Sequence, residues 1–131
     1  MIRSFEIITL RLSGMRGSTE YEIIDKNGTC TVTFYRIRFS DGEDKRVADK
    51  QVICKNADIL KLMNDCRILN WDGFEGKHPR GVHDGIMFSF EAVVNDHQII
   101  TAHGSENFPK YYREFLRELN LMLEKHTVQK D

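Results

Sequence analysis

The sequence predicts an α+β domain in which a mainly antiparallel sheet of about five strands carries two helices packed on one face. Three observations lead to this prediction. Two pairs of strand-like segments are each joined by a short turn, as in antiparallel hairpins. Two other segments repeat apolar residues with the spacing of an amphipathic helix. The strand-like and helical segments alternate along the chain, and the expected order is β-β-β-α-β-β-α.

The N-terminal third of the chain reads as three strands. The segments rich in β-branched and aromatic residues are 5–12, 20–26 and 29–39. The second and third segments flank Asn27-Gly28, a pair that strongly favours a two-residue hairpin loop. Such a loop places Ile23 opposite Val32, so one face of the hairpin is apolar, as a half-buried sheet requires.

The middle of the chain changes from strand-like to helical spacing. Residues 47–54 are ambiguous and suit a short edge strand at most. Residues 57–69 then predict a helix, because four apolar residues repeat with helical spacing: Ile59, Leu62, Met63 and Cys66. Asn56 is the expected N-cap of this helix, and Asn70 is expected to end it in the left-handed conformation.

A second hairpin and a second helix complete the domain. Residues 86–94 and 98–102 flank a short polar turn and are expected to pair. A long apolar stripe predicts the last helix over residues 108–126, with Asn107 as its cap and Pro109 in its first turn. The whole chain, 1–131, is expected to form a single domain with a frayed tail at 126–131.

Composition narrows the classes of partner. The 131 residues carry a formal net charge of −1, so no overall field attracts nucleic acid or an anionic membrane. No segment has the apolar length of a signal peptide or a membrane span. The three cysteines, Cys30, Cys54 and Cys66, have neither zinc-site nor redox-motif spacing and are expected to be buried free thiols. A cytoplasmic location is therefore expected.

The segment from Trp71 to Pro109 holds the candidate functional residues. It contains four of the five histidines and five of the nine glycines of the chain, and loops commonly carry function. Aromatic residues and arginine dominate binding hot spots, which makes the loop a candidate surface for a protein or small-molecule partner. The candidate binding residues are Trp71, Asp72, Phe74, Arg80, His83, Asp84 and Asn107. A structural alternative is that the Trp71 and Phe74 rings close the end of the core.

A metal site is the second hypothesis for this segment. His78, His83 and His103, with Asp84, have the nitrogen and oxygen donors that zinc accepts, although no helix fixes their spacing. The simpler interpretation is exposed or locally bonded histidines, with Asp-Gly pairs that form turns. No nucleophile motif, phosphate-binding loop or dinucleotide fingerprint is present in the sequence, so we expect no cofactor.

One longer pattern resembles a known group of proteins. It consists of Trp71-Asp72-Gly73-Phe74, then Asp84-Gly85 before a Phe-x-Phe strand, then Gly104-x-x-x-Phe108-Pro109-x-x-Tyr112. This pattern is similar to a family of small uncharacterised bacterial proteins without an assigned activity, cofactor or catalytic residue. The resemblance implies that these residues form one shared feature, and it implies no activity.

The sequence therefore favours a non-catalytic binding module that uses the loop from Trp71 to Asp84. One alternative is a metal-dependent hydrolase built on His78, His83, Asp84 and His103. The other is a subunit of a homodimer or larger homo-oligomer.

Overall fold

The fold is described from a computed structural model, in which residues 1–15, 17–83 and 85–128 are placed. The elements in chain order are β1 (Phe5–Gly14), β2 (Gly17–Asp25), β3 (Thr29–Ser40), β4 (Glu43–Lys55), α1 (Asn56–Asp65), the 3-10 helix η1 (Ile68–Trp71), β5 (Phe74–Gly76), β6 (Met87–Val94), β7 (Gln98–Ser105) and α2 (Tyr112–Val128). The strands form one seven-stranded sheet in the order β4-β3-β2-β1-β6-β7-β5. Neighbouring strands are antiparallel except β5 and β7, which are parallel.

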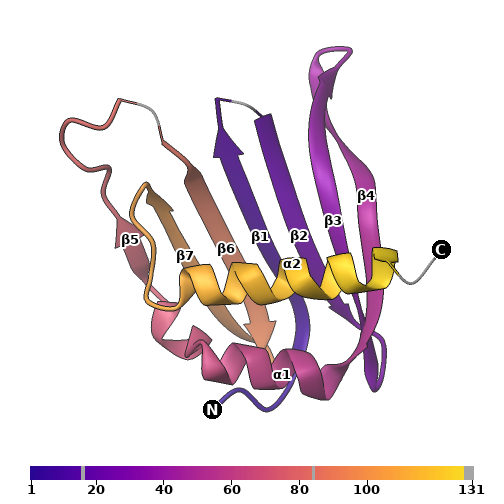
Figure 1. The fold of residues 1–131 in the computed structure, drawn as a ribbon. Coiled ribbons are helices and arrows are strands. Elements are labelled where there is room, and N and C mark those ends of the chain that lie inside the picture. Colours follow the sequence, from indigo (N-terminus) through magenta and orange to yellow (C-terminus); the bar gives the residue numbers. More distant parts are fainter. Residues whose placement is uncertain (16, 84, 129–131) are drawn as a thin grey trace.

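Both α-helices cover the same face of this sheet (Figure 1). The apolar core fills the space between the helices and the sheet, and its largest fully buried side chains include Trp71, Phe90 and Phe115. The α+β class is therefore as predicted. The predicted strand number is wrong, because the sheet has seven strands and one parallel pair.

The two additional strands lie at the two edges of the sheet. β4 is 13 residues long, although only a short edge strand at 47–54 was expected. Its first half, Glu43 to Asp49, is exposed and highly charged, so no alternation of apolar and polar residues marks it. β5 has only three residues, too few for a periodic pattern. Charged or very short edge strands resist pairing with other chains. This gives a physical reason for the charged first half of β4 and for the short length of β5.

Both predicted hairpins are present with the expected core faces. Ile23 pairs with Val32 as predicted, and both side chains are buried. The turn residues Asn27 and Gly28 have φ angles of +58° and +100°, so both adopt the positive φ that a tight hairpin turn uses. The core-facing residues of β6 are also buried: Phe88, Phe90, Ala92 and Val94.

The ends of α1 differ from the prediction. The helix starts at Asn56, whose side-chain amide donates to the Asp25 carboxylate instead of capping the helix. It ends at Asp65, because Arg67 takes the left-handed conformation (φ +53°) that was expected at Asn70. η1 then follows directly. Its left-handed start turns the chain so that Trp71 enters the core.

The start of α2 is also later than predicted. Tyr111 has a φ of +69°, which interrupts helical geometry between Pro109 and Tyr112. The Tyr112 N–H donates to the Pro109 carbonyl in a turn (3.2 Å), and Tyr112 is the first residue of the helix. Asn107 is therefore not the cap of α2. The helix continues to Val128, past the expected end at residue 126, and the rest of the expected tail, residues 129–131, lies outside the described residues.

Candidate binding surface at the distal end of the sheet

Trp71 and Phe74 pack against the core, which agrees with the structural alternative that their rings close its end. Trp71 is only 2% exposed, and its ring contacts Phe90 and Phe115 with centroids 5.0 and 5.5 Å apart. Its indole N–H donates to the Lys110 carbonyl (3.0 Å), so its polar atom is also satisfied. Phe74 is half-buried beside Phe88. Trp71 therefore offers no surface to a partner.

Asp72 attaches β5 to the sheet. Its carboxylate accepts the backbone N–H of Thr101 (3.0 Å), and the Gly73 N–H donates to the Thr101 carbonyl (2.8 Å). Gly73 has a φ of +81°, so the positive φ expected of this Asp-Gly pair is present. The side chain of Asp72 bonds β7 instead of its own turn. Asp72 is thus a structural anchor at the base of the loop.

Two glycines let the chain after β7 pass close to the sheet. A Cβ atom at Gly76 or Gly104 would collide with the carbonyl oxygen of Asn107, and at Gly104 it would also lie 2.8 Å from Phe88 Cε1. The Asn107 side chain is exposed and donates to the Lys77 carbonyl (3.4 Å). Asn107 therefore fastens the start of the loop after β5, and it does not lie at the N-terminus of a helix.

The loop of residues 77–83 projects from this base (Figure 1). His78 supports it from within, since Nδ1 lies 2.7 Å from Ser105 Oγ and Nε2 is paired with the Val82 carbonyl. Arg80 and His83 are both exposed. Within the described part of the chain, neither side chain forms a hydrogen bond, an ion pair or a ring contact. Of the predicted binding residues, these two remain available to a partner, and Asp84 lies outside the described residues.

Glu106 closes the far end of the same loop. Its carboxylate accepts the Ile86 N–H (2.6 Å), and its own N–H donates to the Ile86 carbonyl (2.9 Å). A Cβ atom at Gly85 would collide with the Glu106 side chain, so glycine gives the space for this clamp. Glu106 therefore fixes the position of Ile86.

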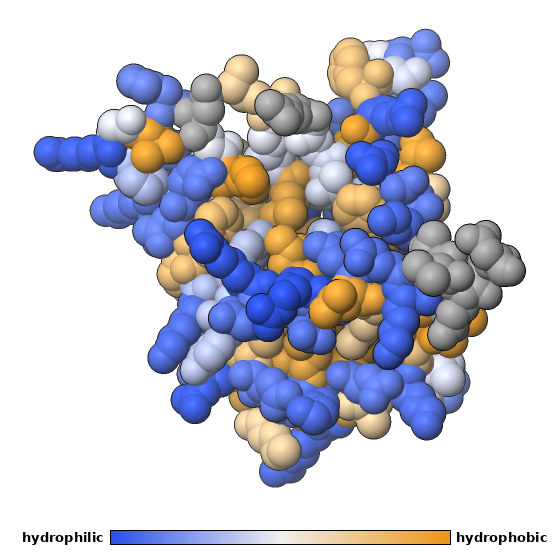
Figure 2. All heavy atoms as spheres, in the orientation of Figure 1, coloured by the Kyte–Doolittle hydropathy of each residue, from blue (hydrophilic) through white to orange (hydrophobic). Residues whose placement is uncertain are grey.

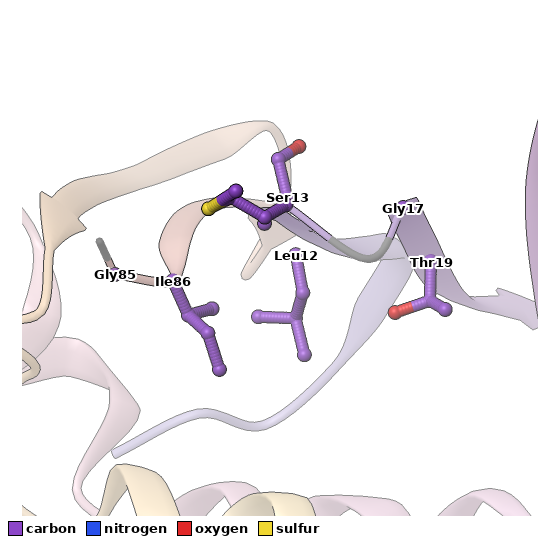
Figure 3. A pocket seen from close by; sticks show the side chains of 8 residues that line it. Leu12, Ser13, Gly17, Thr19, Gly85 and Ile86 are labelled. Carbon is purple, nitrogen blue, oxygen red and sulfur yellow. The ribbon is translucent and has the colours of Figure 1, made fainter.

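An apolar hollow lies between Ile86 and the turn that joins β1 to β2. Its volume is about 390 Å³, and it is lined by residues 12–15, 17, 19, 85 and 86. Leu12, Thr19 and Ile86 point to the same side, whereas Ser13 points away (Figure 3). Leu12 and Thr19 are cross-strand neighbours, and the next pair toward the core is Leu10 and Tyr21. α2 covers this second pair, because the Tyr21 hydroxyl donates a hydrogen bond to Asn120 of α2 (2.6 Å). The hollow therefore begins where α2 ceases to cover the sheet.

The exposed side chains of Met15 and Ile86 line this hollow, and other large exposed apolar residues lie at the same end of the sheet. We call this part of the molecule the distal end: residues 13–15 and 17–18 at the joined ends of β1 and β2, the β3–β4 turn with its flanking strand ends, and residues 77–83 and 85–87. It holds six of the ten large apolar side chains found exposed in the described part of the chain: Met15, Phe39, Val47, Val82, Ile86 and Met87. Strand alternation places Met87, the partner of Ser13, on the other face. In Figure 2 a strip of hydrophobic surface runs up the middle of the visible face between hydrophilic areas.

Ion pairs hold the long β3–β4 hairpin beside this surface. Arg46 of β4 reaches across β3 and lies 2.7 Å from Glu20 and 3.1 Å from Glu22 of β2. Its guanidinium also lies over the Tyr35 ring, 4.3 Å from the centroid. The hydrogen bonds to the two carboxylates raise the pKa of Arg46 above its ordinary value. This network links the charged half of β4 to the centre of the sheet.

The predicted metal ligands do not form a cluster in the described part of the chain. There, no three His, Cys, Asp or Glu side chains lie close enough to hold a metal ion. Both ring nitrogens of His78 are already bonded. His103 is exposed on β7, opposite Ser89 of β6 and Glu75 of β5. Asp84, the carboxylate of the predicted set, is outside the described residues.

Comparison with known proteins found no match. No protein-family model matches the chain, and no curated protein matches it. Neither α-helix of the described residues has the length and apolar character that crossing a membrane requires.

Sequence reasoning missed the apolar half of the surface, which comes from segments far apart in the chain. The signal available was a methionine within a glycine-containing turn at Gly14-Met15 and an Ile86-Met87 pair directly after Asp84-Gly85.

Proposed function

We propose that the protein is a non-catalytic binding module and that the distal end is its binding surface. The observation that carries this proposal is the apolar hollow between Leu12, Thr19 and Ile86, which the exposed Met15 and Ile86 side chains line. Soluble monomers seldom expose neighbouring large apolar residues, and such patches commonly mark interaction sites. Met15 and Phe39 are 81% and 75% exposed, so neither contributes much to the core.

The loop of residues 77–83 adds charge to this surface. Lys77, Arg80 and His83 are exposed, and among the described residues no carboxylate forms an ion pair with Lys77 or Arg80. On the β3–β4 hairpin, Asp41, Asp44 and Asp49 are each paired with a basic side chain, whereas the exposed Glu43 forms no ion pair among the described residues. The free charge of the loop thus favours a partner with an apolar group and a nearby anionic group. The hollow has the size of a small ligand site or of one large side chain of a protein partner.

The metal-dependent hydrolase has less support. A metal site requires converging ligands, but both ring nitrogens of His78 already bond Ser105 and Val82 within the loop. A homo-oligomer through the β4 edge is also less favoured, because Glu43, Asp44, Lys45 and Arg46 place charges along that edge.

Two fluorescent probes test the proposed surface. Anilinonaphthalenesulfonate is apolar and anionic, and phenylnaphthylamine is apolar and neutral. We expect both to bind the wild-type protein. We expect Ile86→Asp to weaken both on the order of tenfold, because it removes an apolar contact and places a carboxylate that resists desolvation beside the probe. Lys77→Ala/Arg80→Ala should weaken only the anionic probe.

Leu121→Asp is the matched control, because Leu121 is 49% exposed on α2, outside the distal end. It should leave both affinities unchanged. Equal binding by the wild-type and Ile86→Asp proteins would reject the proposed surface.

A further inference from the structure

Cys30 and Cys54 are direct cross-strand partners. They lie opposite each other in the antiparallel pair of β3 and the edge strand β4, between the pairs Thr29–Lys55 and Thr31–Ile53. Cα atoms of directly opposed residues are about 4.5–5.5 Å apart. A disulfide accepts Cα separations of roughly 4.4–6.8 Å, so the sheet already holds the two residues at a suitable spacing. Both thiols are free in the structure.

The Cys54 thiol also affects the pKa of Cys30. Burial, followed by the charge of Cys54, raises the pKa of Cys30 to about 12, and a hydrogen bond with the Cys54 backbone partly opposes this shift. Burial also raises the pKa of Cys54. Asp58 contributes to both shifts, and Asp25 contributes to that of Cys30. Both thiols are therefore protonated near neutral pH, and their reaction should accelerate as the pH rises.

The two positions differ in access. Cys30 is fully buried, whereas Cys54 is half-buried on the edge strand, where no further strand covers it. A reagent from solution would thus meet Cys54 first, and Cys30 would be the second, internal thiol. An accessible outer thiol next to a resolving inner thiol is the spatial arrangement of redox-sensitive cysteine pairs, although the raised pKa of Cys54 makes its reaction slow at neutral pH.

We propose that Cys30 and Cys54 form a dithiol site that a small-molecule disulfide converts reversibly to an intramolecular disulfide. The Cys54 thiolate attacks one sulfur of oxidised glutathione, which forms a mixed disulfide and releases one glutathione thiolate. The Cys30 thiolate then attacks the Cys54 sulfur and releases the second glutathione. The protein loses two thiol protons and two electrons, and one oxidised glutathione becomes two reduced molecules.

The product would close the β3–β4 hairpin. The bond would tie β4 to β3 two residues before α1 begins at Asn56, and it would enclose residues 31–53. A cross-link that closes a loop of this length restricts the unfolded chain and raises the unfolding temperature. In a reducing cytoplasm such a bond is transient, which suits a sensor and not a permanent staple.

The test is oxidation of the full chain by oxidised glutathione at about pH 9.5, above the ordinary thiol pKa of about 8.5, because the raised pKa values of both thiols leave little thiolate at lower pH. We expect the number of titratable thiols in the denatured protein to fall from three to one. The mass should fall by about 2 Da for the two lost hydrogens. A peptide map should show Cys30 joined to Cys54, and reduction by dithiothreitol should reverse all three changes.

Cys66→Ala is the matched control, because Cys66 is buried at the end of α1 and has no part in the proposed bond. It should retain the full response, whereas Cys54→Ser should lose it. In the wild-type protein, oxidation should raise the unfolding midpoint by at least about 5 °C. Cys54→Ser should show no such rise, and this comparison does not require substitution of the buried Cys30.

Three results would overturn the proposal. One is a stable glutathione adduct on Cys54 without release of the second glutathione. Another is a disulfide between two chains. The third is a wild-type thiol count that stays at three while the protein remains folded.

Discussion

The half of the sheet beneath the helices and the distal end use apolar residues in opposite ways. Between the helices and the sheet, the rings of Trp71, Phe90 and Phe115 pack against one another and exclude water. At the distal end, Met15 and Phe39 stand in solvent with most of their surface exposed. Yet the same strands, β1 and β3, run through both regions. The difference arises because α2 crosses the sheet halfway along and leaves the upper strand ends uncovered (Figure 1).

This contrast separates residues that hold the fold from residues that are free to bind. Burial of large apolar side chains supplies most of the stability of a domain, so substitutions beneath the helices should act on folding. Exposed apolar side chains contribute little to folding, so their retention at one end needs another explanation. The following three predictions test this separation, from the largest expected effect to the smallest.

Replacement of Trp71 should have the largest effect on stability. Trp71→Ala removes a side chain that is 2% exposed and leaves a cavity between Phe90 and Phe115. We expect a loss of about 3–5 kcal/mol in the free energy of unfolding, measured by urea denaturation followed by circular dichroism. A loss below about 1 kcal/mol would contradict the assignment of Trp71 to the core.

Replacement of Gly104 should have an intermediate effect. In Gly104→Ala, the added Cβ would lie 2.8 Å from Phe88 Cε1 and would collide with the Asn107 carbonyl. Since backbone has to move to make room, we expect a loss of roughly 1–3 kcal/mol in the same denaturation experiment. Gly14→Ala is the control at the distal end, because the nearest atom to its new Cβ, Ile86 Cγ1, lies at an ordinary 3.9 Å. Equal losses for the two variants would refute the close-packing argument.

Replacement of Phe39 should have the smallest effect on folding. Phe39 is 75% exposed near the β3–β4 turn, and surface substitutions usually change stability by less than about 0.5 kcal/mol. Phe39→Ser should therefore unfold at the same urea concentration as the wild-type protein. A loss similar to that of Gly104→Ala would mean that the distal end belongs to the core, and the contrast between the two regions would fail.

The parts of the fold that could be predicted are those where local chemistry specifies one answer. Asn27-Gly28 requires a tight turn, and the turn fixes the pairing of Ile23 with Val32. The full length of β4 could not be predicted from the short edge strand expected at 47–54, because its charged first half gains its strand conformation from pairing with β3 and from the ion pairs of Arg46. The start of α2 could not be predicted either, since the left-handed Tyr111 depends on packing at the end of the core.

The candidate site was predictable only in its loop. The density of glycine and histidine drew attention to residues 77–83, and Arg80 and His83 are indeed exposed there. The apolar hollow combines Leu12, Thr19 and Ile86, and their proximity follows from the pairing of β1 with both β2 and β6. The pairing of Cys30 with Cys54 likewise depends on a register that includes a bulge between Phe34 and Tyr35. Such long-range registers are not visible in local sequence patterns.

The central position of β1 has a consequence for how the chain is made. β1 leaves the ribosome before the other six strands of this sheet, yet it lies between β2 and β6 in the finished sheet. The meander from β1 to β4 can assemble early, but one side of β1 then keeps its backbone donors and acceptors unpaired. Only when residues 87–94 emerge can β6 cover that side. Throughout the synthesis of the intervening segment, the nascent protein thus carries an open apolar edge at its centre, the period in which a chaperone would protect it most.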